Sequence, residues 1–105
     1  YDLDNPYEGV FKQNDAVSPE EFIKQGYSGI DLDFEVHGEN TTVDDTEYYY
    51  AYLRYYYKEY IGVVYRIVLV KNGNGWALAS NPYPLLTTSN TPNIPVEIIN
   101  EVNKL

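Results

Sequence analysis

Apolar and charged residues alternate along residues 31–37, which read DLDFEVH. Leu32, Phe34 and Val36 fall on one side of an extended chain, and acidic residues and His37 fall on the other. A period of two with one apolar side predicts a half-buried β-strand. The GENTTVDDT segment that follows is rich in polar and turn residues, so we interpret it as a loop.

Residues 46–70 contain nine of the thirteen tyrosines of the chain. A helix is one interpretation, because it would align Glu47, Ala51, Arg54 and Lys58 on one side. Aromatic and β-branched side chains prefer the pleated surface of a sheet, however. Consecutive tyrosines would also place rings on every side of a helix, whereas a strand divides them between two faces. We therefore favour a strand.

A second strand is expected at residues 63–70, VVYRIVLV, with Gly62 as a turn or bulge before it. The NGNG sequence after it predicts a hairpin turn, since Asn and Gly tolerate a positive φ. Residues 76–79 would return as the partner strand. Prolines at positions 82 and 84 would end that strand, because proline cannot donate to a β-ladder.

Two short helices flank these strands in our interpretation. Ser18, Pro19 and Glu21 form a capping box with proline at the first helical position, and Gly26 offers a stop. Residues 95–105 place four aliphatic residues on one side of a second helix: Ile98, Ile99, Val102 and Leu105.

The predicted fold class is therefore α+β: a short N-terminal helix, a curved antiparallel sheet of about four strands and a short C-terminal helix. The length of 105 residues suits one domain. We assign residues 1–16 to an entry segment and residues 17–105 to the domain.

Net charge and missing residue types narrow the function. A formal charge of −9 opposes binding to phosphate backbones and to anionic lipid, so we expect no direct nucleic-acid contact. The absence of cysteine excludes disulfides and thiolate chemistry. Because the sequence starts at Tyr1 and contains no Met, we expect a piece of a longer protein, held at a membrane only by a segment outside this sequence.

Candidate chemical sites are weak. Asp31, Asp33 and Glu35 share one strand face, but their spacing is not that of a calcium loop, so a solvated face is favoured over a cation site. His37 is the only histidine, and no nucleophile motif accompanies it. We expect a non-enzyme without a metal or a cofactor.

The tyrosines suggest a surface instead, because a phenol ring combines a large apolar body with a polar hydroxyl. Such a face is either ordinary covered sheet, a protein interface, in which Tyr is enriched, or a ligand platform. The interface residues that we predict are Tyr48, Tyr50, Tyr52 and Tyr56.

Residues 65–86, YRIVLVKNGNGWALASNPYPLL, resemble the last hairpin of cystatin-like or nuclear-transport-factor-2-like domains. The features in common are a long strand, a glycine turn, Gly-Trp and a short strand that ends in proline. Within that superfamily they are similar to the extracytoplasmic domains of Gram-positive conjugative transfer proteins of the TcpC and TraM type. One departure is that such domains carry more helix before the sheet than residues 18–25 provide.

This resemblance implies a non-catalytic scaffold of a conjugative, type IV secretion-like complex that acts by protein–protein contacts. It also implies an extracytoplasmic location, at the cell surface or cell wall of a Gram-positive bacterium, and self-association, often as a trimer. The alternatives are a cystatin-like surface lipoprotein that binds a ligand or acts in immunity or exclusion, and an enzyme of the same fold.

Overall fold

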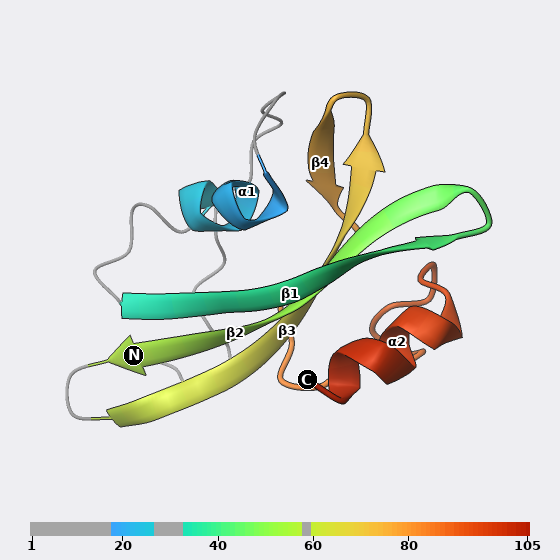
Figure 1. The fold of residues 1–105 in the computed structure, drawn as a ribbon. Helices are drawn as coiled ribbons and strands as arrows, with labels where there is room; N and C mark the ends of the chain where they lie inside the picture. The colour runs from blue at the N-terminus through green and yellow to red at the C-terminus, as the bar shows by residue number, and fades with distance from the viewer. Residues whose placement is uncertain (1–17, 27–32, 58–59) are drawn as a thin grey trace.

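The computed structural model describes residues 18–26, 33–57 and 60–105. The predicted entry segment and Asp31 lie outside the described residues. The elements, in chain order, are α1 (Pro19–Gly26), β1 (Asp33–Val43), β2 (Thr46–Tyr57), β3 (Tyr60–Asn72), β4 (Gly75–Leu78) and α2 (Val96–Asn103) (Figure 1). The α+β class predicted from the sequence is confirmed.

The four strands form one antiparallel sheet in the order β1-β2-β3-β4, so each strand pairs with its neighbour in the sequence. The tyrosine-rich segment is therefore a central strand, as predicted. β1 lies at one margin of the sheet, and the short β4 lies at the other. Figure 1 shows a marked twist between the strands.

The prediction of a polar loop after residue 37 was wrong, because β1 continues to Val43. Its polar half pairs residue by residue with the tyrosines of β2, from Gly38 opposite Ala51 to Val43 opposite Thr46. The Asn40 side chain also donates a hydrogen bond to Glu47 across the two strands (3.2 Å). Pairing with the tyrosine-rich strand β2 thus keeps residues 38–43 in a strand, although their local composition is typical of a loop.

Gly62 lies inside β3, so it is not in the turn, but it lies at the bulge that we predicted as the alternative. Tyr55 pairs with Val63 and Tyr57 pairs with Tyr60, so two residues of β3, Ile61 and Gly62, lie opposite the single residue Tyr56 of β2. The predicted strand at residues 63–70 is therefore the inner part of a longer one.

The two outer hairpins have two-residue turns that use different residue types. Between β3 and β4, Gly73 has a φ of 63°, as the NGNG motif predicts. Between β1 and β2, Asp44 and Asp45 have φ values of 50° and 63°. Turns with two positive φ values match the twist of a hairpin but favour Asn and Gly, so the Asp-Asp turn is strained.

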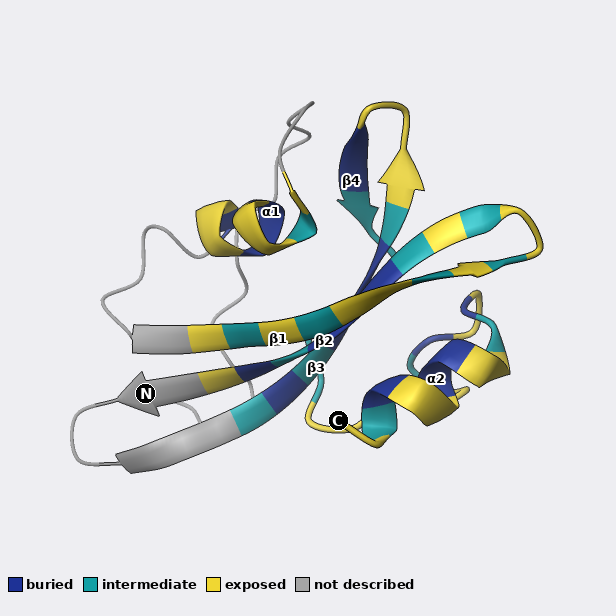
Figure 2. Ribbon diagram, in the orientation of Figure 1, coloured by how far each residue is buried: buried dark blue, intermediate teal, exposed yellow. Residues whose placement is uncertain are grey.

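The sheet has two faces, which we name after the helices that pack on them; Figure 2 shows the two helices and the buried positions of the strands. The α1 face carries a buried cluster: Phe22, Ile23, Tyr49, Ala51, Leu53, Tyr65, Ile67, Leu69 and Trp76. The α2 face carries a second: Tyr50, Val68, Leu86, Ile94, Ile98, Ile99 and Val102. This division follows the alternation of side chains along β2 and β3.

The helix ends explain where each helix begins and how it packs. The Ser18 hydroxyl accepts a hydrogen bond from the Glu21 amide (3.2 Å), which satisfies one free N–H at the start of α1. In α2, three of the predicted apolar residues are buried, Ile98, Ile99 and Val102. The fourth, Leu105, lies beyond the end of the helix and is 37% exposed, which corrects its predicted place in the apolar side.

Candidate functional site: the open patch of the α2 face

The four predicted interface tyrosines all lie in β2. Tyr48, Tyr50 and Tyr52 alternate along β2 and share the α2 face, where their partners on β3 are Val70, Val68 and Arg66. Tyr56 lies in β2, but its side chain is outside the described residues.

Helix α2 covers Tyr50, which is 6% exposed and belongs to the buried cluster of this face. Its hydroxyl donates a hydrogen bond to the Glu39 carboxylate of β1 (2.9 Å). Burial raises the pKa of Tyr50, and the bond to Glu39 raises it further. Tyr48 is half-buried and packs against the same cluster. Both side chains therefore contribute to the fold, and Tyr50 is too buried to be a primary contact surface.

Tyr52 is half-buried and belongs to a different environment. Its ring stacks on the His37 imidazole of β1, with ring centroids 4.9 Å apart and planes at 20°. The Arg54 guanidinium lies 6.0 Å from the centroid of the same ring. On β1, the His37 Nε2 atom lies 3.5 Å from a Glu35 carboxylate oxygen, and both side chains are about half exposed. We call Glu35, His37, Tyr52 and Arg54 the open patch.

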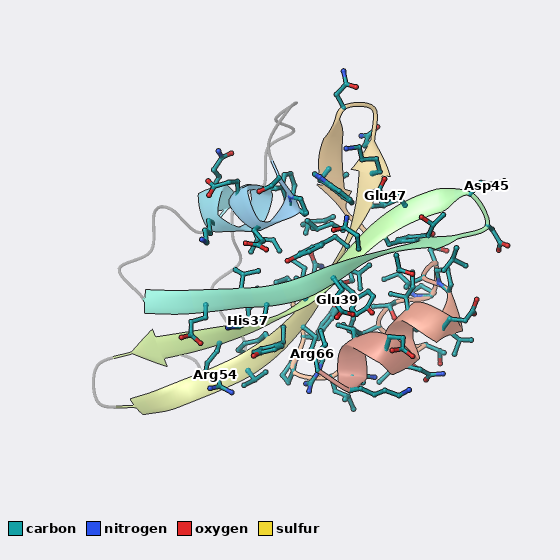
Figure 3. The ribbon with its side chains drawn as sticks, in the orientation of Figure 1. His37, Glu39, Asp45, Glu47, Arg54 and Arg66 are labelled. Carbon is teal, nitrogen blue, oxygen red and sulfur yellow. The ribbon has the colours of Figure 1, made fainter. Side chains whose placement is uncertain are left out.

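Arg66 marks the boundary between the covered and the open parts of the α2 face. Its guanidinium donates hydrogen bonds to the carbonyl oxygens of Val102, Pro84 and Leu105. A cation is favourable at the C-terminal end of a helix, where carbonyl groups lack partners. Arg66 thereby fixes the end of α2 beside Tyr52, and Figure 3 shows His37 and Arg54 on the part of the sheet past that end.

The chain after β4 strengthens the same boundary. Tyr83 forms an isolated antiparallel bridge with Arg66, with backbone N–H to O distances of 2.7 and 3.0 Å. The Asn103 amide then both accepts from and donates to the backbone of Leu86 (3.2 and 2.9 Å). These bonds secure α2 to the sheet, so the open patch is bordered by a fixed structure.

The opposite face shows no comparable surface among the described residues of β2. Tyr49, Ala51 and Leu53 are each at most 2% exposed. Tyr49 lies over Gly38 of β1, where an added Cβ would come within 2.6 Å of its ring and of the Tyr50 carbonyl oxygen. Gly38 thus makes room for an aromatic ring, which covers the glycine in return.

The Tyr49 hydroxyl is buried and has no hydrogen-bond partner in the described part of the chain. Burial, with the charge of Glu20 as a second cause, raises the pKa of Tyr49 to about 12. Glu20 lies near enough to act through its charge, although the geometry of a hydrogen bond is not met.

The proposed acidic strand face is only partly described. Asp31 lies outside the described residues, as does the side chain of Asp33, while Glu35 pairs with His37. Residues 18–26, 35–54 and 64–105 bring together no group of three or more His, Cys, Asp or Glu side chains that would hold a metal ion. No described helix is long and apolar enough to cross a membrane.

Comparison of the chain with known protein families, with curated proteins and with solved structures gives no match. The resemblance to cystatin-like domains and to conjugative transfer proteins therefore stays a prediction.

Sequence reasoning found Tyr52 and His37 but did not bring them together, because it ended the first strand at His37. It missed Arg54 as a member of the patch and Arg66 as the residue that binds the C-terminal end of α2. The one available signal for Arg66 was its position, since it is the single charged residue among the apolar residues 61–70.

Proposed function

We propose that this domain is a non-catalytic scaffold that works by protein–protein contact, and that its contact surface is the open patch. A second copy of the chain is the partner that we propose first. The observation that supports this function is the composition of the patch, which combines a half-buried aromatic ring with groups of both charges.

Charge is the main argument for a second copy. Two molecules of charge −9 repel each other over most of their surfaces. The open patch is different because Arg54 lies directly opposite Glu35 on the neighbouring strand, so that a cation and an anion share this face. Patches with both signs can complement a copy of themselves across a two-fold axis, where each residue of one copy meets the other copy in the same way.

Tyrosine and arginine are also the side chains that contribute most often at the centre of protein interfaces. In the open patch the two lie together, and His37 restricts the Tyr52 ring by stacking. A restricted ring loses less conformational entropy on association than a free one.

The wider role that we propose is assembly of a conjugative, type IV secretion-like complex at a Gram-positive cell surface. Its basis is the sequence resemblance over residues 31–86, which is carried by the hairpin block at residues 65–86. The surface lipoprotein remains the alternative: a lipid-modified cysteine upstream in the intact protein would favour it, and a membrane-spanning segment would favour the scaffold.

Light scattering over a range of protein concentrations tests the contact surface. The unmodified chain should have a mass above that of the monomer. Tyr52→Ser should shift the assembly toward the monomer by about tenfold in dissociation constant, since central interface aromatics contribute about 1–2 kcal/mol or more.

Tyr48→Ser is the matched control, because Tyr48 is a half-buried tyrosine on the same strand and face, but packs against the α2 cluster. This variant should leave the assembly mass unchanged while circular dichroism confirms that it is folded. A monomeric unmodified chain, or equal effects of the two variants on mass, would contradict the proposal.

A further inference from the structure

We infer that two copies of this chain join edge to edge through β1, antiparallel, about a two-fold axis at Gly38. The inference rests on the proposed self-association and places its contact at β1. Glu35 and His37 of the open patch then lie beside the partner copy, and Tyr52 and Arg54 lie one strand further in and support them. The axis is perpendicular to the sheet, so the two α2 faces lie on the same side of a continuous eight-stranded sheet.

The length of the open edge is the first argument. β1 spans eleven residues, and in the described part of the chain no strand pairs with its outer side. Typical strands have about five or six residues. A long edge exposes a row of backbone N–H and C=O groups, which proteins usually protect with proline, lysine or a bulge. β1 contains neither Pro nor Lys, and its pairing with β2 is regular throughout.

The placement of carboxylates along β1 is the second argument, because no two of them lie opposite each other when the axis passes through Gly38. This register pairs residue 33 of one copy with residue 43 of the other and so uses the whole strand. On the α2 face, His37 of each copy lies opposite Glu39 of the other, and Glu35 lies opposite Thr41. No two like charges are directly opposite in this arrangement.

Neighbouring registers lack this property. In an antiparallel pair related by a two-fold axis, side chains on the same face lie opposite each other only when the axis passes through a residue. The competing registers are therefore those whose axis lies at another residue of β1. An axis at His37 places Glu35 opposite Glu39 twice, and an axis at Glu39 places two Glu39 side chains opposite each other. Like charges directly opposite destabilise a strand pair.

Two tyrosines of β2 already contact the β1 side chains that this interface would use. The Tyr52 ring stacks on His37, and the Tyr50 hydroxyl donates to one oxygen of the Glu39 carboxylate, whose other oxygen can accept from the partner copy. The tyrosines on the α2 face therefore support the edge, which connects the open patch to the interface. The glycine at the axis adds no side chain where the two strands would be closest.

The chain has no cysteine, so engineered thiols report the register cleanly. We would prepare Glu35→Cys and Thr41→Cys as separate full-length variants, mix them, and treat the mixture with a mild oxidant or a short bifunctional thiol reagent. Residues directly opposite in an antiparallel pair have Cβ atoms about 4.5–5.5 Å apart, close to the spacing of a disulfide. The mixture should yield cross-linked heterodimer at about tenfold the rate of either variant alone.

A mixture of Glu35→Cys and Glu39→Cys is the matched control, because it would cross-link only with the axis at His37. Light scattering on the same samples separates the two proposals. An assembly that Tyr52→Ser weakens but that gives no preference for the 35–41 pair would overturn the edge geometry and leave the proposed function standing. A monomer at all concentrations would overturn both.

Discussion

The two faces of the sheet use the same strands for different purposes. On the α1 face, β2 contributes Tyr49, Ala51 and Leu53, all at most 2% exposed. On the α2 face, the intervening residues of β2 change from buried Tyr50 to half-buried Tyr52 and exposed Arg54. The described β2 residues of the α1 face are all buried, whereas on the α2 face only the part of β2 under helix α2 is buried.

This difference shows that tyrosine content alone does not identify a contact surface. Tyr49 and Tyr52 lie three residues apart on one strand, yet one ring fills the space over a glycine and the other stacks on an exposed imidazole. Side-chain direction and the length of α2 decide which rings stay accessible. If this difference is real, substitutions on the two faces should change the stability of the domain by different amounts.

Truncating a buried side chain on the α1 face should lower the free energy of unfolding far more than truncating a side chain in the open patch. Leu53→Ala removes a fully buried side chain of the α1 cluster, and we expect a loss of about 2–5 kcal/mol in the free energy of unfolding. Tyr52→Ala, one position before it, should cost about 1 kcal/mol or less in a monomeric sample, because its ring is half exposed. Urea unfolding measures both, and equal losses would contradict the contrast between the faces.

Replacing Arg66, which binds the C-terminal end of α2, should expose more of the α2 face to solvent. Arg66→Met leaves the carbonyl oxygens of Val102, Pro84 and Leu105 without their donor, with an expected loss of about 1.5–3 kcal/mol. Amide hydrogen exchange should become faster in α2 and remain slow on the α1 side. Lys71→Met is the control, since it removes from the same strand a cation that only stacks on Trp76, worth about 0.5–1 kcal/mol.

Alkaline pH should lower the stability of the domain through Tyr49 on the α1 face. In the unfolded chain a tyrosine ionises near pH 10, whereas folded Tyr49, with its pKa of about 12, stays protonated longer. Between these values only the unfolded state loses this proton, so stability falls as the pH rises, by about 1–3 kcal/mol over the window.

Tyr49→Phe removes the buried hydroxyl that has no hydrogen-bond partner in the described residues, so it should be nearly neutral at pH 7. It should also reduce the loss of stability between about pH 10 and 12. Unfolding curves at several pH values compare the two proteins. An identical alkaline loss in both would show that Tyr49 is not the responsible group.

The smallest effect should come from the turn that joins β1 to β2. Asp45 adopts a φ of 63°, which glycine accepts without strain. We therefore expect Asp45→Gly to stabilise the domain by about 0.5–1 kcal/mol and to leave both faces unchanged. Thermal unfolding measures this gain. Asn74→Gly, at a turn position that needs no positive φ, is the control and should give no gain.

The sequence predicted those strands and turns that are determined by residues close together in the chain. Alternation around Val36 predicted the start of β1, and the glycine of NGNG predicted the tight turn at Gly73. The second half of β1 was missed because its polar residues become a strand only by pairing with β2. Non-local pairing of this kind is invisible to propensity.

The candidate site was predictable to a similar extent. The strand interpretation divided the tyrosines of residues 46–70 between two faces, and in the structure Tyr48, Tyr50 and Tyr52 share the α2 face. Alternation does not reveal that Arg66 holds α2 over Tyr50 and leaves Tyr52 uncovered, because those hydrogen bonds join residues far apart in the chain.

Two-dimensional NMR of the full chain at increasing concentration tests most directly whether the open face, and not the closed one, makes protein contacts. The account predicts that signals of Glu35, His37, Tyr52 and Arg54 shift or broaden with concentration. Signals of Phe22 and Ile23 in α1 should stay unchanged. Spectra that are independent of concentration, or shifts that centre on α1, would contradict it.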